Sequence, residues 1–172
     1  MSADELVDIV DEQDRVVGQA TRREVRARRL RHRSTYVLVF NADSQLFVHQ
    51  RTTTKDIYPG CYDVAFGGVL RTGEEYDAGA RRELREEAGI DNVPLRRVLS
   101  FRFDDDRNHV NGVLYSATYD GPLQLQTSEV QAGQWMDLDA VVELAERAPF
   151  CPDGIEALRR YLDRLNEARA GR

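Results

Sequence analysis

The segment from Gly68 to Ile90 constrains the fold of this chain more than any other stretch. Three acids in it, Glu83, Glu86 and Glu87, are spaced at i, i+3 and i+4, so in a helix they lie on one face. Crowded carboxylates repel one another and raise each other's pKa unless a cation lies among them. Oxygen ligands grouped in this way suit a hard divalent ion such as Mg²⁺. The segment therefore predicts a helix that carries a metal site.

A solvated helix face with ion pairs such as Arg82–Glu86 is the ordinary alternative for a stretch rich in Glu and Arg. The apolar stripe of the same helix argues against it. Ala80 and Leu84 belong to that stripe, and Glu87 falls within roughly 60° of Leu84 at about 100° per residue. The acids therefore border the packed edge of the helix, where side chains are held in place and partly dehydrated.

The same segment resembles the signature of the Nudix hydrolase family. That signature is a glycine, five residues, a glutamate, seven residues, and then Arg-Glu-apolar-x-Glu-Glu-x-Gly-apolar. Every fixed position is met, at Gly68, Glu74, Arg82, Glu83, Leu84, Glu86, Glu87, Gly89 and Ile90. The motif is specific because so many positions are fixed, although it covers only residues 68–90 of the 172. The order of predicted strands and helices extends the likeness over most of the chain.

The resemblance implies hydrolysis of a pyrophosphate linkage in a nucleoside diphosphate joined to another group. It implies Mg²⁺ as the cofactor, for which Mn²⁺ can substitute. Glu86 and Glu87 are then the core metal ligands, and Glu83 is either a third ligand or the base that takes a proton from water. Arg82 is expected to orient these acids, and Gly68 to turn its backbone carbonyl toward a metal.

Further candidates lie outside this glutamate-bearing helix. Many family members supply one more acid from the loop before the last short strand, and Glu129 is the catalytic candidate here, against an ordinary surface acid. Arg51 and Lys55 are candidates for binding substrate phosphate, against ordinary surface charge. Glu74 is a candidate for the substrate side and for an ion pair with Arg82. Which acid is the general base stays open.

The residues before the signature, including His32 and Arg51, are similar to the branch of the superfamily that contains isopentenyl diphosphate isomerases. An isomerase needs a cysteine on the strand that leads into the helix, and Phe66 stands at that place. Isomerase activity is therefore the disfavoured alternative, and His32 is interpreted as a structural or substrate-side histidine. A non-catalytic ligand sensor is a third hypothesis, which the complete set of signature acids disfavours.

The predicted architecture is a single domain over residues 1–172, of mixed α and β structure. The resemblance supplies the expected fold, a three-layer α/β/α sandwich with a mixed sheet. An N-terminal hairpin is expected at about 5–20 and a C-terminal helix at about 152–169, where Pro152 suits the first helical turn. Apolar runs predict further strands, at 35–40, 46–50, 95–103, 110–119 and 133–136.

Composition agrees with a folded enzyme inside the cell. Hydrophobic residues make up 41% and charged residues 31% of the chain. No signal peptide or membrane span is visible, and two cysteines are too few for a disulfide scaffold, so we expect a cytoplasmic protein with free thiols. Cys61 is expected to be a buried structural thiol. The net charge of −6 disfavours nucleic acid as a partner.

One segment departs from this acidic balance. Residues 21–34 hold seven arginines and one histidine against one glutamate. A solvated basic helix or loop is the favoured interpretation, and contact of one or two arginines with substrate phosphate is the alternative. No other motif narrows the substrate beyond a small-molecule diphosphate. A homodimer through the N-terminal hairpin rests on analogy alone.

Overall fold

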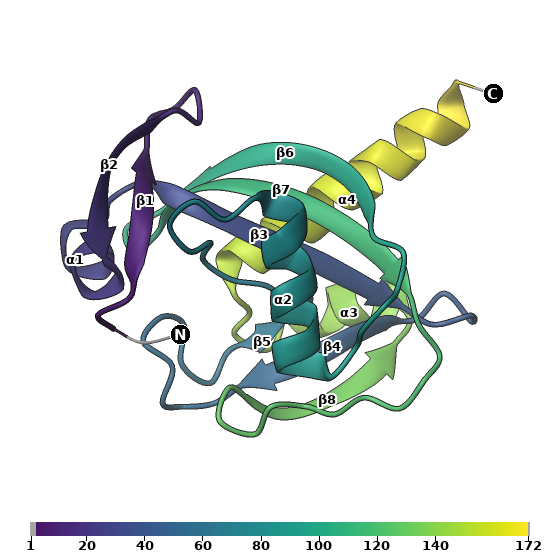
Figure 1. The fold of residues 1–172 in the computed structure, drawn as a ribbon. Helices are drawn as coiled ribbons and strands as arrows, with labels where there is room; N and C mark the ends of the chain where they lie inside the picture. Colours follow the sequence, from purple (N-terminus) through teal and green to yellow (C-terminus); the bar gives the residue numbers. More distant parts are fainter. Residues whose placement is uncertain (1–2, 172) are drawn as a thin grey trace.

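The computed structural model describes residues 3–171. Their helices and strands are arranged as Figure 1 shows. In chain order the elements are β1 (Leu6–Val10), β2 (Val16–Thr21), α1 (Arg22–Arg28), β3 (His32–Phe40), β4 (Leu46–Arg51), β5 (Tyr62–Asp63), α2 (Tyr76–Ala88), β6 (Arg96–Asp104), β7 (His109–Thr118), β8 (Val130–Met136), α3 (Leu138–Ala145) and α4 (Pro152–Ala170).

The strands form one mixed sheet with β3 and β7 at its centre. These two strands pair in parallel along their whole length, from His32–Val110 to Phe40–Thr118. Both are buried at most positions, as expected of parallel strands with both faces covered. β6 pairs with the far edge of β7, and β8 with β4, both antiparallel.

The other edge of β3 is divided between two strands. β1 meets it at His32, and β4 meets it at Phe40, opposite Leu46. Between these points the chain that leads to α2 bridges to β3, for example from Phe66 to Val37. β3 and β4 therefore diverge from Phe40, and the segment 64–70 lies in the space between them.

Alternation along β3 sends its side chains into two apolar layers. Val37 and Val39 pack in the layer under α2, together with Leu84. Leu38 packs in the layer under α3 and α4, together with Leu158. Figure 1 shows α2 in front of the sheet and α4 behind it. Helices thus cover both faces of a mixed sheet, which confirms the predicted fold class.

Most predicted elements are present, and the boundaries that differ most are the starts of β3 and β8. β3 begins at His32 instead of residue 35. β8 begins at Val130 instead of residue 133, because residues 130–132 pair with β4 although most of β8 is exposed and carries no apolar pattern. Pairing with a neighbouring strand therefore extends β8 beyond what its own sequence indicates.

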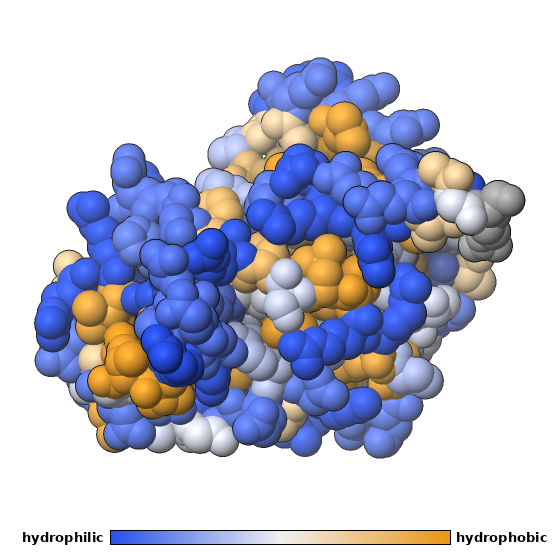
Figure 2. Space-filling view, turned by 90° about the horizontal axis from the view of Figure 1, so that it is seen from above, coloured by the Kyte–Doolittle hydropathy of each residue, from blue (hydrophilic) through white to orange (hydrophobic). Residues whose placement is uncertain are grey.

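The surface is mostly hydrophilic. Figure 2 shows one face on which apolar side chains are confined to separate patches. The exposed large apolar residues of the described chain are Leu6, Val16, Val17 and Val142. Within residues 3–171, helices are all too short or too polar to cross a membrane.

Candidate functional site

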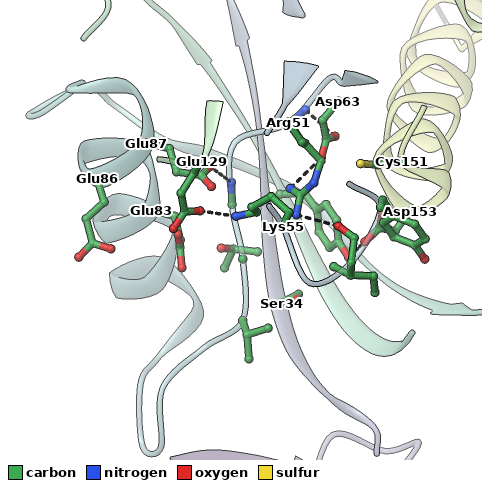
Figure 3. A pocket seen from close by; sticks show the side chains of 18 of the residues that line it. Ser34, Arg51, Lys55, Asp63, Glu83, Glu86, Glu87, Glu129, Cys151 and Asp153 are labelled. Atoms are coloured by element: carbon green, nitrogen blue, oxygen red, sulfur yellow. Dashed lines mark hydrogen bonds and ion pairs between the residues drawn. The ribbon is translucent and has the colours of Figure 1, made fainter. Parts of the chain in front are cut away.

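A pocket lies beside the segment 64–70, with α2 on one side and the start of α4 on the other (Figure 3). It is narrow, with a cavity volume of about 70 Å³, and opens to solvent. We call one side the acidic wall, which consists of Glu83, Glu86, Glu87 and Glu129. We call the other side the inner wall, which consists of Arg51, Asp63, Cys151 and Asp153. Lys55 projects between the two walls.

α2 builds the acidic wall because its apolar stripe anchors it to the sheet. Leu84 is fully buried in the layer under the helix. Glu83 and Glu87, one helical turn apart, flank that stripe and are themselves buried, whereas the Glu86 side chain is 39% exposed. Glu87 Oε2 accepts a hydrogen bond from the backbone N–H of Gly67 at 3.0 Å. Glu83 and Glu87 therefore border the packed edge of the helix as predicted, whereas Glu86 lies at the rim.

Arg82 ties this wall together from behind. Its Nε and Nη2 donate to the two carboxylate oxygens of Glu74 at 2.7 and 2.8 Å. Its Nη1 donates to Glu83 at 2.6 Å and to Glu86 at 3.3 Å. Nη2 also reaches the carbonyl of Val69 at 3.3 Å. One buried guanidinium therefore holds three carboxylates and the loop before α2 in a fixed arrangement.

The acidic wall holds more negative charge than its cations balance. Burial raises the pKa of Glu83 and of Glu87, and the charge of Glu83 raises that of Glu87 further. The pKa of Glu129 is lowered instead: burial acts to raise it, but the hydrogen bond and ion pair with Lys55 outweigh that effect. Buried carboxylates that resist ionisation in this way are a donor set suited to a divalent cation.

The carboxylates are not yet gathered around one point. Among residues 3–171, no three His, Cys, Asp or Glu side chains stand close enough together to hold a metal ion. Two of the acids are paired with cations of the chain: Glu86 lies 3.3 Å from Arg82 and 3.6 Å from Arg71, and Glu129 is paired with Lys55. Carboxylate oxygens are the donors that a divalent cation prefers, so a cation in the pocket would compete with these partners for Glu86 and Glu129.

Two glycines shape the floor of the pocket. At Gly67, φ is +153° and an added Cβ would lie 2.0 Å from the carbonyl oxygen of Thr35, so no other residue fits. The carbonyl of Gly68 accepts a hydrogen bond from Thr35 N at 3.0 Å, which occupies one lone pair of the oxygen predicted to face a metal. A Cβ at Gly68 would meet the carboxylate of Glu83 at 2.9 Å.

The predicted substrate-side residues fall in different places. Arg51 and Lys55 both line the pocket. Arg51 Nη1 lies 3.8 Å from Asp63, its Nη2 donates to a loop carbonyl at 3.2 Å, and its Nε is buried without a hydrogen-bond partner among the described residues. Glu74 lies behind the wall with both oxygens on Arg82, so its position favours a positioning role over substrate contact.

Sequence reasoning missed most of the inner wall. Burial raises the pKa of Asp63 to about 6 and also raises the pKa of Asp153. Asp153 accepts a hydrogen bond from the hydroxyl of Tyr36 at 2.9 Å, and Gly154 follows it, where a Cβ would lie 2.3 Å from Asp63. These residues come from β3, β5 and α4, so no local pattern brings them together.

Two residues that bear on the isomerase alternative, His32 and Phe66, are structural. His32 is buried, with Nδ1 2.9 Å from the carbonyl of Leu30, and burial lowers its pKa to about 3. Phe66 is buried and stacks on His49 and Phe47. Cys61 is a free thiol but only half-buried, so the expectation of a buried thiol is wrong; the buried free thiol is Cys151. Phe66, at the position predicted for the cysteine of an isomerase, is thus a packing residue, and the cysteine that lines the pocket is Cys151 on the inner wall.

Comparison with known proteins agrees with the acidic wall. The family model for the NUDIX domain matches residues 30–160. An uncharacterized Nudix hydrolase of Pseudomonas aeruginosa is 43% identical over 159 residues, which cover 92% of this chain and 94% of that protein. An uncharacterized Nudix hydrolase of Escherichia coli K12 is 38% identical over 170 residues, which cover 98% and 93%.

Solved structures have the same fold. The crystal structure of a protein from Deinococcus radiodurans is similar with a TM-score of 0.78 at 26% identity, covering 91% of this chain and 98% of that one. The MutT protein of Methanosarcina mazei is similar with a TM-score of 0.67 at 21% identity, covering 79% and 95%. At that lower identity the likeness shows the fold alone.

Proposed function

Because this chain belongs to the Nudix hydrolase family, whose members act on pyrophosphate bonds, we propose that it hydrolyses the pyrophosphate linkage of a nucleoside diphosphate joined to another group, with Mg²⁺ as cofactor. The observation that carries the proposal is the acidic wall. Two of its carboxylates are buried on α2, a third stands at the rim, and Glu129 joins them from the segment just before β8.

We assign the divalent cation to Glu86 and Glu87, with Glu83 beside them. Bound there, it would neutralise the diphosphate and lower the pKa of the attacking water. Glu83 and Glu129 are the two candidates for taking the proton of that water, since both carboxylates line the pocket. Arg82 acts as a positioning residue, because it holds Glu83 and Glu86 by hydrogen bonds and lies behind the wall.

Lys55 and Arg51 are assigned to the substrate phosphates. Lys55 projects between the acidic wall and the inner wall, and Arg51 lies on the inner wall with a buried Nε that makes no hydrogen bond within the described chain. A diphosphate in the pocket would supply the missing acceptor for Arg51. Together the two cations offset the repulsion between an anionic substrate and an acidic wall.

The test removes one charge at a time from the acidic wall. Glu86→Gln and Glu87→Gln keep the shape of the side chain, and we expect each to lower Mg²⁺-dependent phosphate release by more than about a hundredfold, because changes that only support metal ligands already cost 10–100-fold. Glu75→Gln, at the exposed start of α2, is the matched control. Calorimetric titration with Mn²⁺ gives a second readout, and unchanged turnover in both variants would refute the site.

The substrate class needs a second experiment. A panel of diphosphate compounds is incubated with Mg²⁺ or Mn²⁺, and the products are identified. We expect cleavage between two phosphorus atoms, with no isomerised product. A product of unchanged mass would favour the isomerase alternative instead.

A further inference from the structure

The arginine-rich segment supplies two side chains to the pocket. Arg22 and Arg26 lie one turn apart on α1, and both line the pocket with side chains only 15% and 18% exposed. Arg28, on the same helix, is exposed and lines neither the pocket nor its mouth. The segment is therefore more than a solvated basic face, because two of its arginines add positive charge to the same pocket as the acidic wall.

A groove leads outward from this part of the pocket. It shares Arg22, Arg26, Lys55 and Glu129 with the pocket and continues along the loop that contains Asp56. A substrate whose diphosphate lies between Lys55 and the acidic wall can therefore extend along α1 without leaving the protein surface. The side chains that meet such an extension first are the two arginines.

The charge of Arg26 is poorly compensated. Arg22 Nη2 lies 3.2 Å from Asp56, but Arg26 Nε lies 3.7 Å from the same carboxylate. Arg26 Nη1 donates to the neutral side chain of Asn108 at 2.9 Å, and its Nε makes no hydrogen bond within the described chain. Burial lowers the pKa of Arg26, and the charge of Asp56 offsets this only in part. A further anion would satisfy this buried cation.

We propose that Arg22 and Arg26 bind an anionic group of the substrate beyond the diphosphate that is cleaved, and that this group is a third phosphate. The inference rests on the proposed function and narrows it to nucleoside triphosphates and similar chains of phosphates. Guanidinium groups suit this task because they form paired hydrogen bonds with phosphate oxygens. The phosphate replaces the carboxylate of Asp56, which is 44% exposed and can turn to solvent.

A purely structural ion pair predicts a different pattern of mutants. If Arg22 and Arg26 only fastened the loop at Asp56 to α1, loss of Asp56 and loss of either arginine would have the same effect. If the arginines bind phosphate, Asp56 competes with the ligand. Asp56→Asn then strengthens binding of the third phosphate, whereas Arg22→Gln and Arg26→Gln weaken it.

The test compares inorganic pyrophosphate with inorganic tripolyphosphate by calorimetry at a fixed concentration of free Mg²⁺. We expect the wild-type protein to bind tripolyphosphate about tenfold more tightly than pyrophosphate. Arg22→Gln and Arg26→Gln should remove most of that preference, Asp56→Asn should increase it, and Arg28→Gln should leave it unchanged. Thermal unfolding checks each fold, and Arg26→Lys, which keeps the charge, replaces Arg26→Gln if that variant does not fold.

Three outcomes overturn the inference: no preference in the wild-type protein, an unchanged preference in both Gln variants, or the same loss in Asp56→Asn as in the arginine variants. Steady-state kinetics of phosphoanhydride cleavage show whether only the site for the third phosphate is refuted or the proposed function as well. A protein that cleaves matched nucleoside di- and triphosphates with equal kcat/KM is still a pyrophosphohydrolase but has no site for a third phosphate. A protein that cleaves no phosphoanhydride refutes the proposed function itself.

Discussion

Arg82 shows how much one side chain organises at the residue scale. Burial disfavours its charge, but the hydrogen bonds that it donates to Glu74, followed by the charge of Glu83 and the hydrogen bond that it donates to Glu83, hold its pKa above the ordinary value. Its planar guanidinium donates two parallel hydrogen bonds to Glu74, from Nε and Nη2, and its third nitrogen, Nη1, donates to Glu83. A lysine ammonium has no such fork, so Arg and Lys are not equivalent here.

The first prediction concerns this pair. Arg82→Lys and Glu74→Gln should each lower kcat by about tenfold or more, with a parallel loss of Mn²⁺ affinity, because the metal-side carboxylates lose their support. The double variant should be little worse than Arg82→Lys alone, since both changes break the same interaction. Kinetics and calorimetry measure both effects, with the exposed Arg85→Lys as control. Losses that simply add would show that the two residues act independently.

At the scale of elements, the segment 64–70 decides where the pocket lies. Phe66 of this segment pairs with Val37 of β3, and the backbone N–H of Gly67 donates a hydrogen bond to the carboxylate of Glu87. The backbone approaches Thr35 so closely at Gly67 that a side chain is excluded there. The segment 64–70, which lies outside the regular strands and helices, therefore connects the edge of β3 with the pocket floor and the acidic wall.

The second prediction separates structure from activity in this segment. Gly67→Ala should cost about 2–4 kcal/mol of unfolding free energy, because its Cβ would strike the backbone of Thr35 and its φ is strained for alanine. Gly68→Ala should cost less than about 1 kcal/mol, because its Cβ meets only the carboxylate end of the Glu83 side chain and no backbone, yet it should lower kcat about tenfold by displacing that carboxylate.

Urea unfolding and steady-state kinetics distinguish the two glycines. Gly18→Ala is the matched control, since nothing lies within 4 Å of an added Cβ there and it should change neither quantity. Equal stabilities of Gly67→Ala and Gly18→Ala would contradict the account of the pocket floor.

At the scale of the whole molecule, the central sheet buries two histidines without charge. His32 on β3 and His49 on β4 are 1% and 2% exposed. Burial lowers the pKa of each to about 3, and for His49 the charges of Arg51 and Lys55 add to the effect. In the unfolded chain a histidine takes up its proton at about pH 6.5. The unfolded state therefore binds more protons at these sites between about pH 6.5 and 3, and the native state loses stability as pH falls through that window.

The third prediction isolates one histidine. Between pH 6.5 and 5, the wild-type protein should lose about 1.6 kcal/mol more unfolding free energy than His49→Gln, because the slope rises from half of about 1.4 kcal/mol per pH unit at pH 6.5 toward the full value at pH 5. Buried acids such as Asp63, with its pKa raised to about 6, change stability in the opposite direction, but they contribute equally to both proteins. Urea titrations at several pH values measure the difference. Parallel stability curves would mean that His49 is not buried as a neutral group.

The sequence by itself determined the glutamate helix, the central strands and the family. It could do so because each of these features depends on residues of one continuous stretch. Helical spacing places Glu83 and Glu87 beside the apolar stripe that contains Leu84, and runs of apolar residues indicate β3 and β7. Local periodicity tells which side chains share a face of one element.

Only the tertiary structure decided what faces the glutamates. The divergence of β3 and β4, the inner wall around Asp63 and Asp153, and the entry of Arg22 and Arg26 into the pocket all join segments far apart in the chain. These segments come together only when whole elements pack against one another. The stabilising energy of that packing comes from the apolar layers on both faces of the sheet, and each layer is built from residues far apart in the sequence. The sequence alone therefore indicates surface charge for the basic segment, whereas the tertiary structure makes two of its arginines part of a pocket.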